Sequence, residues 1–393
     1  MTTPHVPEVS DQEAIDLVLQ LMAIPGSGGE ERAVMDFLGE KLAKAGAPPI
    51  EFDGAETRSE LGGGIGNGVL RLPGTIEGPR RLLLAHTDTV PVCVGSRPEV
   101  RDGIVHSADP TTGLGADDRA GTAVLLTTAL ALLRSGAPHP PITFLWTVQE
   151  EGGINGARNV EVSMLGEPAL AFNLDGGSPA KLVIGATGCD RIWIEIDGHP
   201  SHAGMAPEKG VSAAAIAALG VADLVENGWH GLVEKHGKTG TTNFGVIEAG
   251  VATNVVAERA RLHVEARSHD PAFRAEIVRA LETAFHRAVE RVVSSEGRRG
   301  SVRFSGNLNY ESFRLPTEDP SLTAARKALR ALGEEPEIGV TNGGLDANWI
   351  THHGMPCVTI GNGQHDIHTV NETLDLAEFQ LARRVAWRLA TGA

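Results

Sequence analysis

The chain has 393 residues, of which 41% are hydrophobic and 21% are charged, and its formal charge at pH 7 is −16. This composition is typical of a globular protein with two or three domains. The negative charge argues against nucleic-acid binding, which needs a basic surface, and no apolar run is long enough to span a membrane. The cysteines are few and widely spaced, and the first residues carry no signal-peptide pattern, so we expect a cytoplasmic protein.

The first half of the chain predicts an α/β domain. Two helices are expected within residues 10–45, broken by proline and glycine at 25–29, and short strands and turns occupy 50–105. The clearest elements are strand 81–85, helix 119–135, strand 142–148, a short helix near Ala157 and strand 169–174. Alternation of this kind indicates a mainly parallel sheet flanked by helices.

The pattern changes after about residue 185. The next predicted elements are strand 191–197, helix 210–227, strands 242–249 and 259–267, helix 271–294 and strand 301–305. This β-α-β-β-α-β order is typical of a split βαβ sandwich with one sheet face uncovered by helices. The α/β pattern then returns, with helix 321–332, strand 358–360 and helix 375–389. We therefore predict a discontinuous catalytic domain, residues 1–186 and 315–393, around an inserted domain, residues 187–314.

Two adjacent carboxylates, Asp117 and Asp118, stand at the start of the apolar helix 119–135. Such a pair is costly, because like charges repel and burial penalises both, unless a cation is bound nearby. Other ligand types come directly after predicted strands, where ligands of open α/β sheets bind. These candidates are His86, Glu150, Glu151 and Asp175, with His368 near the C-terminus.

These residue types favour a centre with two metal ions, because imidazoles and carboxylates are the donors such ions use and a carboxylate can bridge them. We predict two divalent ions per chain, zinc with cobalt or manganese as alternatives. The predicted ligands are His86, Asp117, Glu151, Asp175 and His368. Asp88 is placed to fix the tautomer of a metal-bound His86, and Glu150 is then free to act as the general base.

Several motifs occur in a characteristic order along the chain. They are His86-Thr87-Asp88, Gly115-Ala116-Asp117-Asp118-Arg119-Ala120-Gly121, Glu150-Glu151-Gly152, Leu174-Asp175-Gly176 and His368-x-x-x-Glu372. Together they resemble the dizinc metallopeptidase family of peptidase T, carboxypeptidase G, aminoacylase and succinyl-diaminopimelate desuccinylase. The run from Gly343 to Ile350 looks most like the peptidase T branch.

The resemblance implies a role for each predicted ligand. His86 and Asp175 would hold one metal, Glu151 and His368 the other, and Asp117 would bridge, with Glu150 as the base. The peptide bond between Asp117 and Asp118 is usually cis in this family. His365 competes with His368 as the last ligand, and His368 is preferred because an acidic residue, Glu372, follows it by four positions.

The resemblance also implies that the inserted domain acts as a lid and dimerisation domain. His202 in this domain would stabilise the oxyanion, often in the site of a partner subunit. Asn254 and Arg267 match lid positions that contact substrate, and Arg267 could pair with a substrate carboxylate. Gly343 and Gly344, in the peptidase T-like run, are further candidates for substrate binding.

Three functions remain open on the sequence alone. The first is an exopeptidase acting on short peptides, similar to a tripeptide aminopeptidase. The second uses the same centre as a carboxypeptidase or an N-acyl amino acid deacylase. The third is a non-catalytic binding protein that keeps the fold. The expected partners are a short peptide and a second copy of the chain, and neither nucleic acid nor a membrane.

Overall fold

The computed structural model describes residue 6 and residues 8–392. The stretch 1–5, on which the expectation of no signal peptide rests, lies outside these residues. Among the described residues, no helix combines the length and apolarity that crossing a bilayer requires.

The chain divides into two compact units. The first contains the described residues up to Gly185, then Phe313–Thr341 and the chain from Leu345 onward. The second contains Ala186–Ser312 together with Asn342–Gly344. The short segment 342–344 therefore groups with the second unit, whereas the sequence argument assigned it to residues 315–393.

The first unit contains both helices and strands along its whole length. Its helices are α1 Asp11–Ala23, α2 Arg32–Lys44, α3 Ala116–Ser135, α4 Asn155–Arg158, α7 Pro320–Ala331, α8 Asp346–His352 and α9 Leu376–Thr391. Its strands are β1 Glu51–Phe52, β2 Gly68–Leu72, β3 Arg81–His86, β4 Pro98–Arg101, β5 Ile104–Ser107, β6 Ile142–Thr147, β7 Leu170–Leu174, β8 Lys181–Ala186, β14 Phe313–Arg314, β15 Glu337–Thr341, β16 Cys357–Ile360, β17 Gln364–His365 and β18 Thr373–Asp375.

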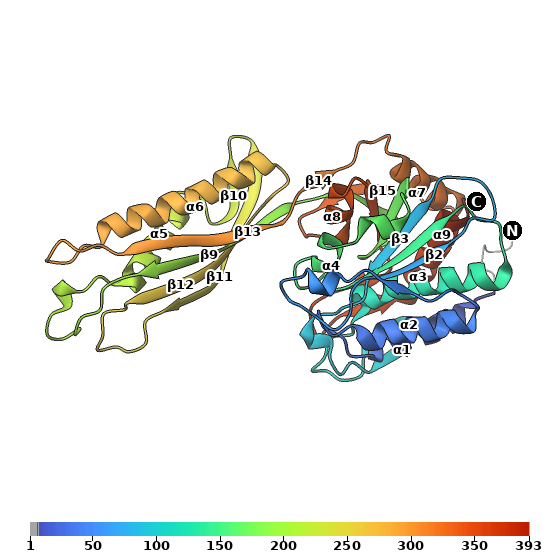
Figure 1. Cartoon of the computed structure of the whole chain (residues 1–393), viewed down its shortest axis with the longest axis horizontal. Coiled ribbons are helices and arrows are strands. Elements are labelled where there is room, and N and C mark those ends of the chain that lie inside the picture. The colour runs from blue at the N-terminus through green and yellow to red at the C-terminus, as the bar shows by residue number, and fades with distance from the viewer. Residues whose placement is uncertain (1–5, 7, 393) are drawn as a thin grey trace. The chain divides into compact units, whose positions relative to one another are not determined.

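The larger sheet of this unit has the order β1-β2-β6-β3-β7-β16-β8-β14, with β15 on β8. Its centre is parallel, because β6 and β7 both run parallel to β3, and β16 runs parallel to β7. β2 and β8 are antiparallel to their neighbours. Helices flank this mostly parallel sheet (Figure 1), which confirms the predicted fold class. A smaller antiparallel sheet has the order β17-β18-β5-β4.

Helix α3 is the buried helix of the first unit. All residues from Ala116 to Leu132 are buried, as expected for a helix that is apolar on every side, and the helix packs against β3, α1 and α9. Its N-terminus carries Asp117 and Asp118, whose backbone angles are not helical and whose connecting peptide bond is cis. Both carboxylates lie beside the end of β3, where they contact His86.

The second unit is an antiparallel sheet covered by helices on one face (Figure 1). Its elements are β9 Gly188–Asp197, α5 Ala213–Glu226, β10 Gly231–Lys235, β11 Lys238–Ala249, β12 Arg259–Ser268, α6 Pro271–Arg291 and β13 Ser301–Tyr310. The strand order is β10-β11-β12-β9-β13. The structure contains the expected β-α-β-β-α-β succession, with β10 as an additional strand that the sequence argument missed.

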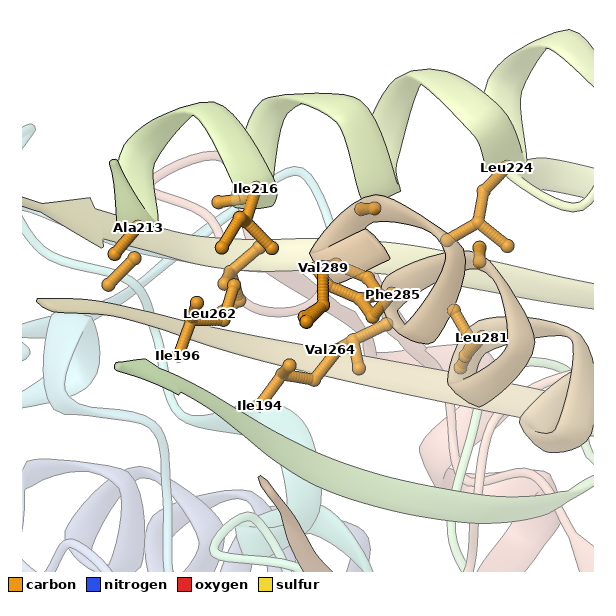
Figure 2. Packing of buried hydrophobic residues seen from close by; sticks show 14 of the residues in the cluster. Ile194, Ile196, Ala213, Ile216, Leu224, Leu262, Val264, Leu281, Phe285 and Val289 are labelled. Carbon is orange, nitrogen blue, oxygen red and sulfur yellow. The ribbon is translucent and has the colours of Figure 1, made fainter. Parts of the chain in front are cut away.

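Alternating side chains build the core of the second unit. Ile194 of β9 and Leu262 and Val264 of β12 point toward α5 and α6, and Phe285 of α6 lies among them (Figure 2). A Cβ atom at Gly220 of α5 would lie 2.8 Å from the Phe285 ring, so glycine allows the two helices to approach closely. This packing fixes the sheet as a platform for the loops at its ends.

Candidate metal centre

The candidate site lies at the carboxyl ends of neighbouring parallel strands. His86 is the last residue of β3, Glu150 and Glu151 follow β6, and Asp175 follows β7. Asp117 begins α3, which packs against β3. Because β6, β3 and β7 are adjacent in the sheet, the strand ends bring these side chains into one region, as the rule for open α/β sheets predicts.

Asp117 lies at the centre of a cluster of carboxylates and imidazoles. Its Oδ1 is 3.1 Å from His86 Nε2, and its Oδ2 is 3.1 Å from His368 Nε2. His368 Nε2 is also 3.0 Å from Glu151 Oε1. Asp117 thus uses a different oxygen toward each histidine, which is what a bridging carboxylate must do.

Asp175 also lies close to His86. Ligand atoms of His86, Asp118 and Asp175 are all within 4.8 Å of one another, and Asp175 Oδ1 accepts a hydrogen bond from Gln364 Nε2 at 3.0 Å. Both oxygens of Asp118 are already engaged, by the backbone N–H of His86 at 3.2 Å and by Asn362 Nδ2 at 2.6 Å. Asp118 therefore holds the surrounding chain, whereas the described residues engage only one oxygen of Asp175 in a hydrogen bond.

Burial makes the negative charges of this cluster costly. It is the main cause, with repulsion from Asp117, that raises the pKa of Asp175 to about 7, and it also raises the pKa of Glu151. Hydrogen bonds to Asp117 and Glu151 raise the pKa of His368 to about 10. Burial opposes a charge on His86, but hydrogen bonds to Asp117 and Asp88 hold its pKa well above the ordinary value.

The donor set provides a test of whether this cluster fits metal ions, because a cation that binds the imidazoles replaces the protons that the nearby carboxylates otherwise stabilise. Protons compensate buried carboxylates only partly, whereas divalent cations neutralise several at once. The donor set combines neutral imidazole nitrogens with carboxylate oxygens, which are the ligands that zinc, cobalt and manganese accept. The residues present therefore fit two divalent cations.

Asp88 connects His86 to the turn that carries Glu150 and Glu151. Its Oδ1 is 3.4 Å from His86 Nδ1, and its two oxygens accept the backbone N–H groups of Glu150 at 2.9 Å and Glu151 at 3.1 Å. The carbonyl oxygen of Asp88 also lies 3.2 Å from His86 Nδ1. Acceptors at Nδ1 favour the tautomer that leaves Nε2 free to bind a cation.

Glu150 is partly buried, and no hydrogen bond from the described residues reaches its carboxylate. Burial is the main cause that raises its pKa well above the ordinary value, and the charges of Asp346 and Glu151 act in the same direction, while His86 opposes them. A carboxylate with a raised pKa and a free oxygen is suited to accept a proton from water.

The two C-terminal histidines are clearly separated in their contacts. His368 contacts Asp117 and Glu151, as described above, and lies in the loop between β17 and β18 with a φ of 64°. His365 instead pairs with Glu378, with 2.7 Å between His365 Nε2 and Glu378 Oε2. Of the two candidates, His368 is the one that lies in the cluster.

Glu372 holds the loop that carries Asp117. Its Oε2 accepts the backbone N–H groups of Leu114 at 2.9 Å and Gly115 at 2.7 Å, and its Oε1 accepts that of Asp117 at 2.9 Å. The sequence argument used Glu372 only to choose between the histidines. In the structure it holds the backbone of Asp117 and of the two residues Leu114 and Gly115.

Sequence reasoning missed further residues around the cluster. Asp346, the first residue of α8, is buried and accepts a hydrogen bond from the Thr147 hydroxyl, and burial raises its pKa to about 6. Asn362 and Gln364 contact Asp118 and Asp175. Both follow β16, but an amide side chain after a strand is common in loops, so no signal in the sequence identified their partners.

The lid residues predicted from the resemblance all lie in the second unit. His202 is exposed, and its Nδ1 accepts the backbone N–H groups of Gly204 and Met205, each at 3.2 Å. The neutral ring must therefore carry its hydrogen on Nε2. The carbonyl of Asn254 accepts the N–H of Ala203 at 3.0 Å, which keeps the Asn254 loop beside the His202 loop.

Arg267 has a partner within the second unit. Its Nε and Nη2 donate to the two oxygens of Glu265, both at 2.9 Å, and its Nη1 donates to the carbonyl of Asn342 at 3.4 Å. Arg267 thus lies next to the segment of Gly343 and Gly344. Glu265 occupies the bidentate edge of the Arg267 guanidinium, so a substrate carboxylate that bound there would have to displace Glu265. The substrate-binding role of Arg267 stays a prediction.

The chain is similar to known proteins in sequence and in structure. Residues 82–391 match the model of peptidase family M20/M25/M40. The uncharacterized protein YqjE of Bacillus subtilis (strain 168) is 30% identical over 371 residues, which cover 94% of this chain and 95% of YqjE. Carboxypeptidase G2 of Pseudomonas sp. (strain RS-16) is 28% identical over 292 residues, or 72% of this chain and 65% of that protein.

Two solved structures are similar over nearly the full length. A tripeptidase from Staphylococcus aureus has 30% sequence identity and a TM-score of 0.86, over 97% of this chain and 98% of its own. Aminopeptidase PepT from Bacillus cereus has 29% identity and a TM-score of 0.82, with the same coverage of both chains.

Proposed function

Because the chain belongs to peptidase family M20/M25/M40, we propose that it is a two-metal exopeptidase that hydrolyses short peptides as a tripeptide aminopeptidase does. The observation that carries this proposal is the cluster in which Asp117 contacts both His86 and His368 while His368 also contacts Glu151. The chain is thus a metal-dependent amide hydrolase, and the non-catalytic alternative is dropped.

In the proposed centre, His86 and Asp175 would hold one ion, Glu151 and His368 would hold the other, and Asp117 would be shared between them. Bound ions of this kind would polarise the carbonyl group of the substrate and would lower the pKa of a bound water molecule to near neutral. Asp88 orients the imidazole of His86 through Nδ1 and also holds the N–H groups of Glu150 and Glu151. The Asp88 carboxylate therefore positions both the proposed ligand His86 and the proposed base Glu150.

Glu150 is the proposed proton carrier. Its free carboxylate accepts a proton from the attacking water and then delivers it to the nitrogen of the departing amine. Burial raises the pKa of Glu150 and so favours its protonated form, which is the form that donates in this second step. In this proposal, Glu150 serves both as the base for the attacking water and as the acid for the departing amine.

His202 is the proposed donor to the oxyanion. Its Nδ1 is occupied by two backbone N–H groups, so its exposed Nε2–H is the end that can donate. Such a donor stabilises the charge that develops on the carbonyl oxygen, and losing one typically costs about 100–1000-fold in rate. Asn254, in the adjoining loop, is proposed to contact the substrate.

We further propose a homodimer formed through the second unit. β10 pairs with β11 only as far as Thr242, and no strand of the described chain covers that side of β11 over Asn243–Ala249. Val246 and Ile247 are exposed on this stretch, and Val251 beyond it is 97% exposed. An uncovered strand edge with apolar side chains is a template for pairing with another chain. Sedimentation that finds only monomers would contradict this proposal.

We place the protein in the cytoplasm. Cys93, Cys189 and Cys357 are free thiols and all are buried, as is usual for proteins of a reducing compartment. Recovery of the active protein from the extracellular fraction of its own cells would contradict this placement.

A substrate panel tests the proposed function. We expect tripeptides with a free amino terminus to be hydrolysed with a kcat/KM at least about tenfold above dipeptides, N-acyl amino acids and peptides with a blocked amino terminus. The names of two structures that are about 30% identical, a tripeptidase and an aminopeptidase, support this order. The assay needs zinc, cobalt and manganese in separate arms, because the ligands suit all three ions.

The alternative is a carboxypeptidase or an N-acyl amino acid deacylase with the same centre, which the similarity to carboxypeptidase G2 supports. Cleavage of peptides with a blocked amino terminus at their C-terminal residue, or preference for N-acyl amino acids, would overturn the aminopeptidase proposal. Either outcome would still be compatible with the proposed two-metal centre.

A further inference from the structure

Glu31 is a buried acidic residue that the proposed mechanism does not use. It is fully buried and precedes α2, yet its side chain makes no capping hydrogen bond to that helix. Its Oε1 instead accepts the backbone N–H groups of Gly29 at 2.8 Å and Gln149 at 2.9 Å. Its Oε2 is buried without a hydrogen-bond partner. A carboxyl group is costly in such a place, so its contact with Gln149 requires an explanation.

Gln149 directly precedes the proposed base and is held from several directions. Its φ of 56° lies in the left-handed region, which non-glycine residues adopt only when their surroundings enforce it. Its side chain accepts from Ser59 Oγ and donates to the carbonyl of Gly62, both at 2.5 Å. Its backbone carbonyl accepts the N–H of Asn155 at 3.0 Å, and its own N–H donates to Glu31.

Glu31 and Asp88 together hold three successive N–H groups. Glu31 binds that of Gln149, and the two oxygens of Asp88 bind those of Glu150 and Glu151. Asp88 fixes the turn from the side of His86, whereas Glu31 fixes it from the N-terminal segment of the chain. The direction in which the Glu150 side chain leaves the backbone depends on both contacts.

We propose that Glu31 is a positioning residue for the base Glu150, acting through the backbone N–H of Gln149. This inference rests on the proposed function, in which Glu150 transfers the proton. The relevant property of Glu31 is the reach of its acceptor oxygen, not its charge. If the oxygen is withdrawn, the turn at Gln149 relaxes and the Glu150 carboxylate moves away from its productive position, while the metal ligands keep their own anchors in Asp88 and Glu372.

Two conservative substitutions distinguish the position of the acceptor oxygen of Glu31 from its negative charge. Glu31→Gln keeps the length and an acceptor oxygen but removes the charge, and we expect it to retain at least about a third of the wild-type kcat. Glu31→Asp keeps the charge but draws the oxygen back by one methylene group, and we expect kcat to fall by about 10–100-fold, the usual cost of a misplacement near 1 Å. In both variants KM and bound metal should match the wild type, and Glu31→Asp should lower the melting temperature only slightly, because it removes a single buried methylene group.

The exposed neighbour Glu30 provides matched controls, because Glu30→Gln and Glu30→Asp make the same chemical changes outside the buried contact. A second readout uses a Glu150→Gln background, where Glu31→Asp should cost less than about twofold further, since no base remains to be misplaced. An active Glu150→Gln enzyme would instead refute the proposed base, which is a separate result.

The proposal is overturned if Glu31→Asp is as active as the wild type, or if Gln and Asp at position 31 lose activity equally. It is also overturned if the Asp variant loses metal or melts earlier in proportion to its loss of kcat, because Glu31 would then be only structural. If Glu31→Asp lowers kcat by the same factor in the Glu150→Gln background as in the wild type, an action through the base is also ruled out.

Discussion

Replacing Glu150 with glutamine is expected to lower kcat by about 100- to 10,000-fold, the range that a general base contributes, without loss of bound metal. The amide keeps the shape of the carboxylate but cannot take a proton from water. Because Glu150 makes no hydrogen bond through its side chain to the proposed ligands, the cluster around Asp117 should stay as it is. Steady-state kinetics and metal analysis on the same preparation measure both quantities.

Glu167→Gln is the matched control for this experiment, because Glu167 is exposed and the change is chemically identical. It should leave kcat and metal content unchanged. Near-normal turnover of the Glu150→Gln enzyme would show that another group acts as the base. A loss of metal in that variant would mean that Glu150 is a ligand rather than a proton carrier.

Replacing His368 with alanine is expected to remove about one metal equivalent per chain. His368 Nε2 contacts both Asp117 and Glu151, at 3.1 Å and 3.0 Å, so the substitution deletes the imidazole of one proposed ion site. Loss of one ion removes transition-state stabilisation of several kcal/mol, which corresponds to about 100-fold or more in kcat/KM. Metal content per chain after gel filtration and kcat/KM without added metal are the measurements.

His365→Ala is the control for this second experiment. His365 pairs with Glu378 rather than with the proposed ligands, so its removal should leave both ions and the activity in place. If the His365 variant loses the ion and the His368 variant keeps it, the assignment of the last ligand is reversed.

The strands that position the site could be read from the sequence because each is a compact apolar run. Leu82, Leu83 and Leu84 of β3 are buried on both faces, as are the residues of β6, and such runs are typical of central parallel strands. A polar residue directly after such a run stands at the strand end. His86 and Asp175 were therefore predictable as neighbours, and the structure brings them together.

Other parts of the site depend on contacts that no local pattern reveals. Glu31 binds an N–H group 118 positions further along the chain, and Asn362 binds a carboxylate 244 positions before it. Neither residue differs in type or spacing from an ordinary helix start or loop residue. Their roles follow from the tertiary fold, which places remote backbone groups within hydrogen-bonding distance.

Short elements were missed for a related reason. β10 is only Gly231–Lys235, and it is a strand because it pairs with β11. The segment Asn342–Gly344 joins the second unit through contacts of Asn342 with Thr187 and Arg267. In both cases a partner distant in sequence determines the structure, so propensity and periodicity could not identify it.

Diffraction at the zinc absorption edge from crystals of the zinc-loaded protein tests the metal centre most directly. The account predicts two anomalous peaks per chain, about 3.5–4 Å apart, with Asp117 between them, one peak beside His86 and Asp175 and the other beside Glu151 and His368. Zinc found elsewhere, or a fully active enzyme with no peak at Asp117, would contradict the account.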